Sequence, residues 1–187
     1  MLITNKNKLL KYLFLYRSIF FKFISFKTSL KDDESLLIIK ALNIKRRKKR
    51  IYFVINKLCD CIDEYYQGKN ICGFKHSKCL CHREKNLNYI NGCCRKCRYQ
   101  TNKGCPTKNF ACKMFTCSFV KDRYTTIKYE DLSLLKVLTP IQRYVLKIDY
   151  FASIDEVTKD INYGPLYSIF SITKRTIKTV FMNKDNS

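Results

Sequence analysis

The feature that most constrains this chain is a concentration of cysteine in its middle third. The sequence has 11 cysteines in 187 residues, and all of them lie between Cys59 and Cys117. Thiols at this density either form disulfide bonds or bind metal. The compartment decides between the two, because disulfide frameworks belong mainly to exported proteins.

The amino-terminal region argues against export. A secretory signal needs an uncharged apolar run followed by a small-residue cleavage site. Here Lys11, Arg17 and Lys22 interrupt the apolar stretch, and no Ala-x-Ala pattern follows it. An odd number of cysteines also fits a disulfide framework poorly. We therefore expect a cytoplasmic protein with reduced thiols, in which the clustered cysteines bind metal.

The spacing of the cysteines predicts which of them are metal ligands. Structural zinc takes four ligands, and two short segments usually supply two each. Cys94 and Cys97 form a C-x2-C clip, and Cys112 and Cys117 form a looser one. Two adjacent cysteines favour two metal sites over one, because neighbours tend to face different ions. The predicted ligands are Cys72, Cys79, Cys93, Cys94, Cys97, Cys105, Cys112 and Cys117.

Two cysteines are excluded from this set by their place in a predicted helix. Cys59 and Cys61 are two residues apart, so they point roughly 200° away from each other around the helix axis and cannot grip one ion. We expect both to be small buried hydrophobic residues.

The kind of metal is less tightly specified than the ligands. The ferredoxin-type cysteine runs are absent, which favours zinc over an iron–sulfur cluster without excluding a cluster held by scattered ligands. A Cys3His zinc site is also open. The additional candidate ligands are Cys81, which is an alternative to Cys79, and His76 and His82.

Cationic residues fill the gaps between the cysteines. A four-thiolate zinc centre carries a formal charge of about −2, because the cysteines bind as thiolates. Neighbouring cations lower thiol pKa values and offset that charge. The residues expected to do this are Arg95, Lys96, Arg98, Lys103, Lys108 and Lys113.

Outside the cysteine segment the apolar pattern is helical. Residues 51–67 carry apolar side chains at three- and four-residue spacing and are followed by Gly68, suited to a helix end. Pro140 and Pro165 suit first helical positions, and Ser153 suits an N-cap. The predicted helices are 8–27, 33–42, 51–67, 130–138, 140–150, 153–161 and 165–182.

These elements predict a mainly α fold in which short helices pack around an irregular, metal-stabilised cysteine-rich segment. The chain divides into basic amphipathic helices over 1–50, a metal-binding core over 51–122 and a helical region over 123–187. No uncharged run is long enough for a transmembrane helix.

The charge of the chain points to polyanionic partners. Lys and Arg number 37 against 15 Asp and Glu, for a net charge of +22. Such an excess attracts nucleic acid or anionic lipid, although an AT-rich genome would also enrich lysine. Residues 45–50, KRRKKR, are expected to be a solvated connector. The broad apolar face of 8–27 suits core packing or, alternatively, peripheral membrane contact.

Residues 138–182 offer a second interpretation of the charge. Their Leu-Thr-Pro-x-x-Arg opening loosely resembles a helix-turn-helix of the sigma-factor or response-regulator type. A third helix from Pro165 would then bring Lys174, Arg175 and Lys178 to a nucleic-acid groove. A plain helical hairpin explains the same pattern.

The cysteine segment resembles a known bacterial family, the zinc- or iron-chelating cysteine-cluster domains. The resemblance covers residues 93–117 and departs from the family at Phe110-Ala111, where the family has Arg-Pro. An upstream C-x2-C of that family is missing. The chain is also similar to cysteine-rich proteins of low-GC bacteria. The matching positions are Cys93, Cys94, Cys97, Gly104-Cys105, Cys112-Lys113, Phe115 and Cys117. The resemblance implies metal chelation and no particular reaction.

Together these patterns predict a zinc-binding cysteine-cluster protein with a structural or interaction role. The sequence has no nucleotide-binding loop and no recognisable Ser/His/Asp or Cys/His set, so catalysis is not expected. A basic nucleic-acid-binding protein is the first alternative, and an iron–sulfur redox or cluster-carrier protein is the second.

Overall fold

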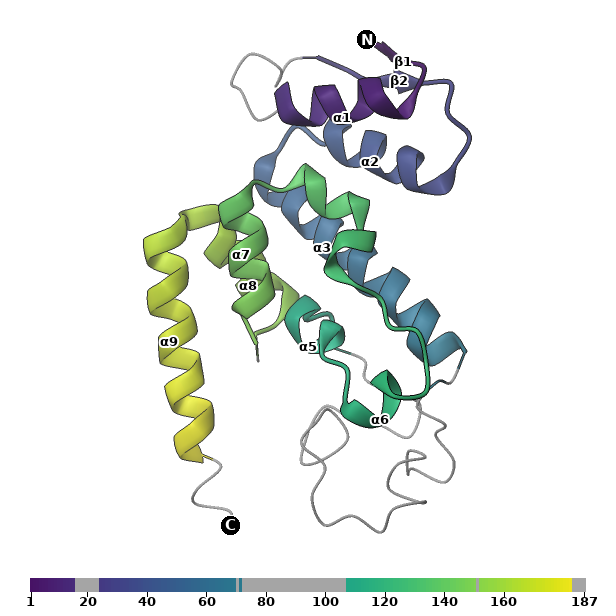
Figure 1. Cartoon of the computed structure of the whole chain (residues 1–187). Helices are drawn as coiled ribbons and strands as arrows, with labels where there is room; N and C mark the ends of the chain where they lie inside the picture. The colour runs from purple at the N-terminus through teal and green to yellow at the C-terminus, as the bar shows by residue number, and fades with distance from the viewer. Residues whose placement is uncertain (16–23, 70, 72–106, 151, 183–187) are drawn as a thin grey trace.

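The computed structural model describes residues 1–15, 24–69, 71, 107–150 and 152–182, and over these residues the protein is mainly helical, as predicted (Figure 1). Of the predicted metal ligands, Cys112 and Cys117 are described. Cys72, Cys79, Cys93, Cys94, Cys97 and Cys105 lie outside the described residues, together with the alternatives His76, Cys81 and His82.

Most elements of the described residues are helices or helical turns, and two are short strands. The amino-terminal third contains β1 (Leu2–Ile3), α1 (Lys6–Leu15), β2 (Lys27–Thr28), α2 (Asp33–Asn43) and α3 (Arg47–Asp63), which continues into a π-helical turn, Glu64–Gly68. The remainder contains α5 (Phe110–Met114), α6 (Ser118–Lys121), two 3-10 turns (Tyr129–Asp131 and Ser133–Val137), α7 (Pro140–Ile148), α8 (Ile154–Tyr163) and α9 (Pro165–Met182).

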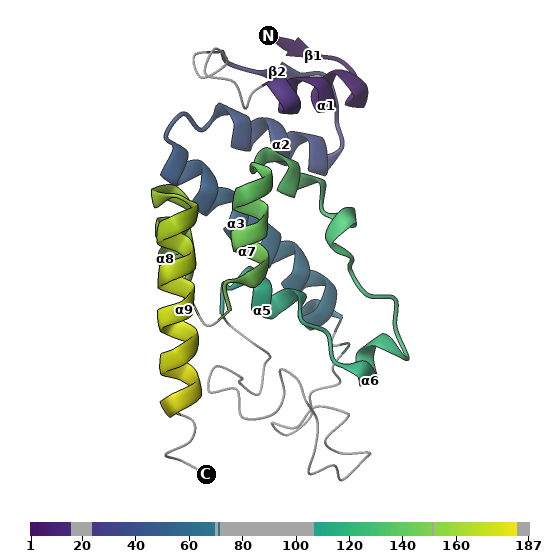
Figure 2. The same cartoon turned by 60° about the vertical axis from the view of Figure 1, so that its left-hand side comes forward.

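Helix α3 is the central element of the fold. Its apolar residues recur every three or four positions, so they form one face, and Ile51, Ile55, Leu58 and Ile62 on that face are almost fully buried. Helices α2, α5 and α8 and the 3-10 turn Ser133–Val137 lie against α3 (Figures 1 and 2). Burying each such side chain contributes about 1.5–3 kcal/mol, so this face of α3 contributes substantially to the stability of the core.

The ends of the carboxy-terminal helices are set by local capping. Thr139 and Gln142 form a capping box at the start of α7, and Ser153 and Glu156 form another at the start of α8. Pro140 and Pro165 are the first residues of α7 and α9, as predicted. Gly164, with φ of 114°, separates α8 from α9 in a conformation that glycine adopts without strain.

The predicted helix over 8–27 is wrong at its carboxy-terminal end. Helix α1 ends at Leu15, residues 24–26 are not helical, and β2 pairs in parallel with β1. The side chain of Asn43 holds this segment, because its amide accepts from the backbone N–H of Phe26 and donates to the Phe26 carbonyl, both at 2.8 Å. Apolar residues recur through residues 16–26 on both sides of Arg17 and Lys22, so periodicity did not mark where the helix stops.

Residues 45–50 are the solvated connector that we expected only at Lys45 and Arg46. Helix α3 begins at Arg47, so four of the six cations form its first turn. Lysine and arginine are good helix formers, and Arg50 donates to the carbonyl of Ile44 at 2.8 Å. The predicted helix 130–138 is also different, since it is a pair of 3-10 turns.

One cluster of buried apolar side chains draws on all three predicted segments. It contains Leu42 from residues 1–50, Phe110 from 51–122 and Leu146 from 123–187. The three-part division stays a prediction, and the packing shows that the segments share a core. None of the helices in the described residues is long and apolar enough to cross a bilayer.

Candidate metal centre and its attachment to helix α3

Cys112 lies in a short helix whose position is fixed by a buried asparagine. Asn109 is the N-cap of α5, and its side-chain oxygen accepts from the backbone N–H of Cys112 at 2.8 Å. The side-chain nitrogen of Asn109 donates to the carbonyls of Asp149 and Ala152, each at 2.8 Å. One amide therefore ties the backbone of Cys112 to the turn that follows α7.

Cys117 lies directly before the next helix, α6. It is the N-cap of α6, and its carbonyl accepts from the N–H groups of Val120 and Lys121. The residue is buried, whereas Cys112 is half-buried. Neither forms a disulfide with the other or with Cys59 or Cys61. Both predicted ligands therefore have defined backbones, set by N-caps at residues 109 and 117.

A cluster of charges on α3 holds the chain on both sides of Cys112. We call Asp60, Asp63 and their lysine partners the aspartate clamp. Lys108 donates to Asp60 at 2.7 Å and to Asp63 at 3.1 Å. Lys113, whose side chain is only 3% exposed, forms a short ion pair with Asp63. Lys57 adds a contact to Asp60 at 3.0 Å from within α3.

The pKa shifts in the clamp follow from these hydrogen bonds. Burial alone would raise the pKa of Asp60, but hydrogen bonds from Lys108 and Lys57 outweigh it, and the net pKa is lowered. Burial alone would lower the pKa of Lys108, but hydrogen bonds to Asp60 and Asp63 reverse the sign. Asp60 and Lys108 are therefore held in their charged forms.

Two of the lysines expected to offset the charge of metal-bound thiolates have partners on α3. Lys108 pairs with Asp60 and Asp63, and Lys113 pairs with Asp63. Their effect on metal-bound thiolates stays a prediction. Their observed contacts attach the cysteine segment to the central helix. The four other cations of that expectation, Arg95, Lys96, Arg98 and Lys103, lie outside the described residues.

The π-helical turn after α3 provides a second attachment. The carbonyl of Tyr66 accepts from the backbone N–H of Ile71 at 2.9 Å, and Ile71 is buried. The Tyr66 hydroxyl lies 3.5 Å from the hydroxyl of Thr116 and accepts from the N–H of Ile127 at 3.0 Å. One tyrosine thus contacts the residue before Cys72 and the residue before Cys117.

The two cysteines of α3 occupy different environments. Cys59 is fully buried, as predicted, and burial raises the pKa of its thiol to about 12. Cys61 is exposed, so the prediction that it is buried is wrong. Its pKa is also raised, by partial desolvation and then by Glu64 and Glu34. The two point to different sides of α3, as their spacing requires.

A buried ion network in the carboxy-terminal helices was missed at the sequence level. Asp149 at the end of α7, Asp160 of α8 and Arg175 of α9 meet beneath the surface; the Arg175–Asp149 distance is 2.7 Å, and the contact with Asp160 is a short ion pair. Asp149 and Asp160 are almost fully buried. Burial raises the pKa of Asp149 to about 6, despite its hydrogen bond from Arg175.

One sequence signal pointed toward this network. Asp160 shares the apolar face of its helix with Val157 and Ile161, and an acidic residue there needs a buried partner. That partner is Arg175, which the helix-turn-helix interpretation would bring to a nucleic-acid groove. The ion pairs turn its guanidinium toward the protein interior, and Lys174 and Lys178 remain exposed.

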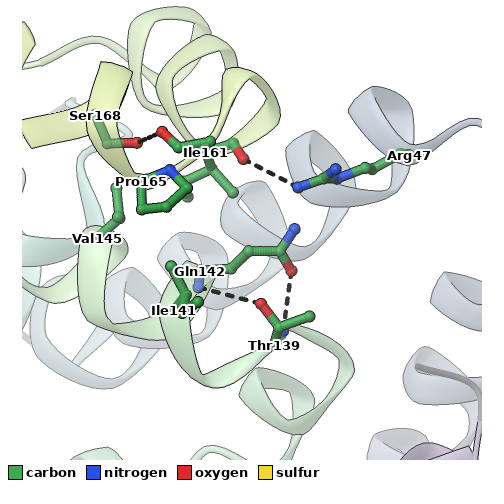
Figure 3. Close-up of a pocket in the computed structure, with 9 residues that line it drawn as sticks. Arg47, Thr139, Ile141, Gln142, Val145, Ile161, Pro165 and Ser168 are labelled. Atoms are coloured by element: carbon green, nitrogen blue, oxygen red, sulfur yellow. Dashed lines mark hydrogen bonds between the residues drawn. The ribbon is translucent and has the colours of Figure 1, made fainter. Parts of the chain in front are cut away.

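A small cavity of about 100 Å³ lies where α7, α9 and the start of α3 meet (Figure 3). Its polar lining is occupied by structural contacts. Arg47 donates to the carbonyl of Ile161 at 3.3 Å, and Thr139 and Gln142 bond to each other as the cap of α7. Ile141, Val145 and Pro165 line the rest. These residues do not form a catalytic set.

The described residues contain no group of three or more histidine, cysteine, aspartate or glutamate side chains that converges as a metal site. No family model matches the chain, and no curated protein and no solved structure matches it either.

Proposed function

We propose that this chain is a metal-binding protein in which cysteines between Cys72 and Cys117 hold zinc, with a structural or interaction role. The single observation that carries the proposal is the attachment of both ends of the cysteine segment to one end of α3. Tyr66 contacts Ile71, directly before Cys72, and Thr116, directly before Cys117.

This attachment supports a shared centre because zinc draws its ligands from separate stretches of chain. Cys72 and Cys117 are 45 positions apart in the sequence (117 − 72). The aspartate clamp adds Lys108 and Lys113 on either side of Cys112. The first and last predicted ligands therefore follow residues held at the same place.

The chemistry of the thiols separates ligands from packing residues. A ligand must bind as a thiolate, whereas Cys59 is fully buried in the apolar core and its thiol pKa is raised to about 12, which favours packing over metal binding. Zinc would be held by four of the predicted ligands, at roughly 2.3 Å from each sulfur. Metal binding would then contribute folding free energy, on the order of 10 kcal/mol for a structural site.

The test is the metal content of protein purified without oxygen. We expect colourless protein with one or two equivalents of zinc, and a loss of at least one equivalent in Cys117→Ser. The matched control is Cys61→Ser, which removes an exposed thiol of α3 and should leave the zinc content unchanged. Brown protein with iron and acid-labile sulfide would favour the iron–sulfur alternative, and metal-free folded protein would refute the proposal.

Nucleic-acid binding is a second candidate, favoured by one observation. Lys45, Arg46, Lys48 and Lys49 are all exposed around the first turn of α3. Cations at a helix amino terminus oppose the helix dipole, so they cost stability there.

The helix-turn-helix interpretation gains less support, because a single residue, Gly164, joins α8 to α9, whereas that motif uses a turn of about three or four residues.

A gel shift at several salt concentrations tests this second candidate. A plot of log affinity against log salt concentration falls with a slope of about −0.9 for each phosphate contact. Replacing Lys48 and Lys49 with glutamine should make this slope less steep by about 1.8. Replacement of the exposed Lys121 and Lys128 is the matched control. An unchanged slope in the α3 variant would exclude this surface.

A further inference from the structure

Helix α9 carries apolar side chains on its outer side. We call Leu166, Ile169, Phe170 and Ile177 the α9 crest. Leu166 is 84% exposed, Phe170 69% and Ile177 51%. Large apolar residues at this exposure, three of them spaced by four and seven positions, form a stripe rather than scattered singles.

The crest is not the side by which α9 packs on the protein. Ser168, Ile172 and Arg175 face the protein, through hydrogen bonds, core packing and ion pairs to α7 and α8. At 100° per residue, Phe170 and Ile177 lie roughly opposite that side. Both views place α9 at an edge of the molecule (Figures 1 and 2).

Further exposed apolar residues adjoin the amino-terminal end of the crest. Ile141 and Pro165 line the same cavity, so Ile141 of α7 lies beside the start of α9 (Figure 3). Ile141 is exposed, as is Tyr163, whose ring contacts that of Tyr167 with centroids 5.0 Å apart. Tyrosines at such an end are typical of membrane–water interfaces.

The charges on α9 indicate what covers the crest. The helix contains no acidic residue, and Lys174 and Lys178 are exposed beside the apolar stripe. A helix with aromatic and aliphatic residues on one face and lysines next to them is typical of helices that lie in an anionic membrane interface. A partner that covers the α9 crest must accept both its apolar side chains and the lysines beside them.

We propose that the α9 crest binds the surface of an anionic lipid bilayer, independently of the metal centre. Leu166, Phe170 and Ile177 enter the boundary between headgroups and acyl chains, and Lys174 and Lys178 contact the lipid phosphates. This surface differs from 8–27, where Leu9 and Leu13 are already buried in the core.

Two other occupants fit the surface less well. A second copy would bring its own Lys174 and Lys178 to the same interface, and the chain already carries a net charge of +22, so like charges oppose that contact. Nucleic acid requires cations and polar groups where the crest presents leucine, isoleucine and phenylalanine. Arg175, the residue best suited to a phosphate, is held by Asp149 and Asp160.

The chain has no tryptophan, so one substitution creates a unique reporter. We expect the fluorescence of Phe170→Trp to shift to shorter wavelength with phosphatidylcholine vesicles that contain phosphatidylglycerol, and to stay unchanged with phosphatidylcholine alone. The matched control is Tyr124→Trp, at an exposed aromatic residue far from α9 in sequence. A shift at position 124 equal to that at position 170, or no shift at either, would overturn the proposal.

Vesicle cosedimentation of substituted proteins gives a second readout. Leu166→Gln with Phe170→Gln should weaken binding at least about tenfold, because two large apolar side chains no longer enter the membrane. Lys174→Gln and Lys178→Gln should each weaken it about fivefold at low salt. The control pair, Leu10→Gln with Phe14→Gln on α1, should bind as the parent does; loss in this pair alone would place the contact in 8–27 instead.

Sedimentation without lipid and with duplex DNA separates the remaining occupants. Monomeric protein at all concentrations is expected. A concentration-dependent dimer that the crest variants abolish would assign the crest to a second copy. Binding of DNA that is lost in the same variants would assign it to nucleic acid, and either result would overturn the membrane proposal.

Discussion

Two pairs of aspartates hold distant segments of this chain together, and they do so with opposite electrostatic balance. In the aspartate clamp, Asp60 and Asp63 share three lysines at a partly exposed site. In the carboxy-terminal network, Asp149 and Asp160 share one arginine below the surface. The clamp has more cations than carboxylates, and the network has fewer.

The difference decides the sign of the pKa shifts. The pKa of Asp60 is lowered, because hydrogen bonds from two lysines outweigh the effect of burial. The pKa of Asp149 is raised to about 6, because burial outweighs one hydrogen bond from Arg175, and its Oδ2 atom has no hydrogen-bond partner among the described residues. The lysines of the clamp therefore stabilise the charged form of Asp60, whereas burial in the carboxy-terminal network penalises the charged form of Asp149.

Removing the single arginine should have the largest effect. Arg175→Met leaves two buried carboxylates without a cation, and breaking a buried pair in this way costs about 3–5 kcal/mol. Urea denaturation monitored by circular dichroism measures the free energy of unfolding. Lys178→Met, an exposed cation on the same helix, should change it by less than about 0.5 kcal/mol. Equal effects of the two substitutions would mean that the network does not hold α9.

The second prediction uses the raised pKa of Asp149. Its folded-state pKa of about 6 lies above the usual 3.8, so protonation favours the folded state. This group's contribution to the unfolding free energy is then fully present below pH 4 and is lost as the pH rises through 6, by on the order of 2–3 kcal/mol. Urea titrations between pH 4 and 7.5 measure it.

Asp149→Asn should remove this component, because the amide cannot ionise and its oxygen still accepts from Arg175. The exposed Asp155→Asn is the matched control and should retain it. The clamp has the opposite sign, since the lowered pKa of Asp60 gives stability that is lost only as the pH falls below its usual range. Parallel pH profiles for the parent and Asp149→Asn would contradict the assignment.

Within the clamp, burial should separate two lysines that make similar contacts. Lys113→Met removes the nearly buried partner of Asp63 and should cost about 1–2 kcal/mol. Lys57→Met removes a more exposed partner of Asp60 and should cost less than about 0.5 kcal/mol. Thermal unfolding of both variants tests the difference, and it would be contradicted by a larger loss in Lys57→Met.

The smallest effect concerns the two thiols next to the clamp. Cys59 should resist alkylation in native protein at pH 8, because it is buried and its pKa is about 12. Cys61 is exposed and should react, slowly, because its pKa is also raised. Mass spectrometry after timed labelling with iodoacetamide gives both rates. Reaction of Cys59 as fast as that of Cys61 would show that the end of α3 opens.

The sequence specified the helices well where local signals were strong. Apolar periodicity marked α3, and Thr139, Pro140, Ser153 and Pro165 marked the starts of α7, α8 and α9. These signals involve neighbouring residues, so one sequence contains them. The extended segment before β2 was not predicted, because it depends on a contact between Phe26 and Asn43, which are 17 positions apart in the sequence.

The attachments around the candidate centre were harder to predict for the same reason. Asp60 and Lys108 are 48 positions apart, and Asp149 and Arg175 are 26 apart. Charge alone does not tell which lysine of 37 cations meets which carboxylate. The ion pairs of Lys108 and Lys113 with α3 were therefore not predicted. The helical position of Cys59 and Cys61 led to a prediction of burial for both, which is right for Cys59 and wrong for Cys61.

The most direct test of the metal centre is X-ray absorption at the zinc edge of protein purified without oxygen. We expect a zinc coordination shell dominated by sulfur at about 2.3 Å, and a reduced sulfur count in Cys117→Ser but not in Cys61→Ser. A first shell of oxygen and nitrogen only, or protein that is folded with intact disulfides and no bound metal, would contradict it.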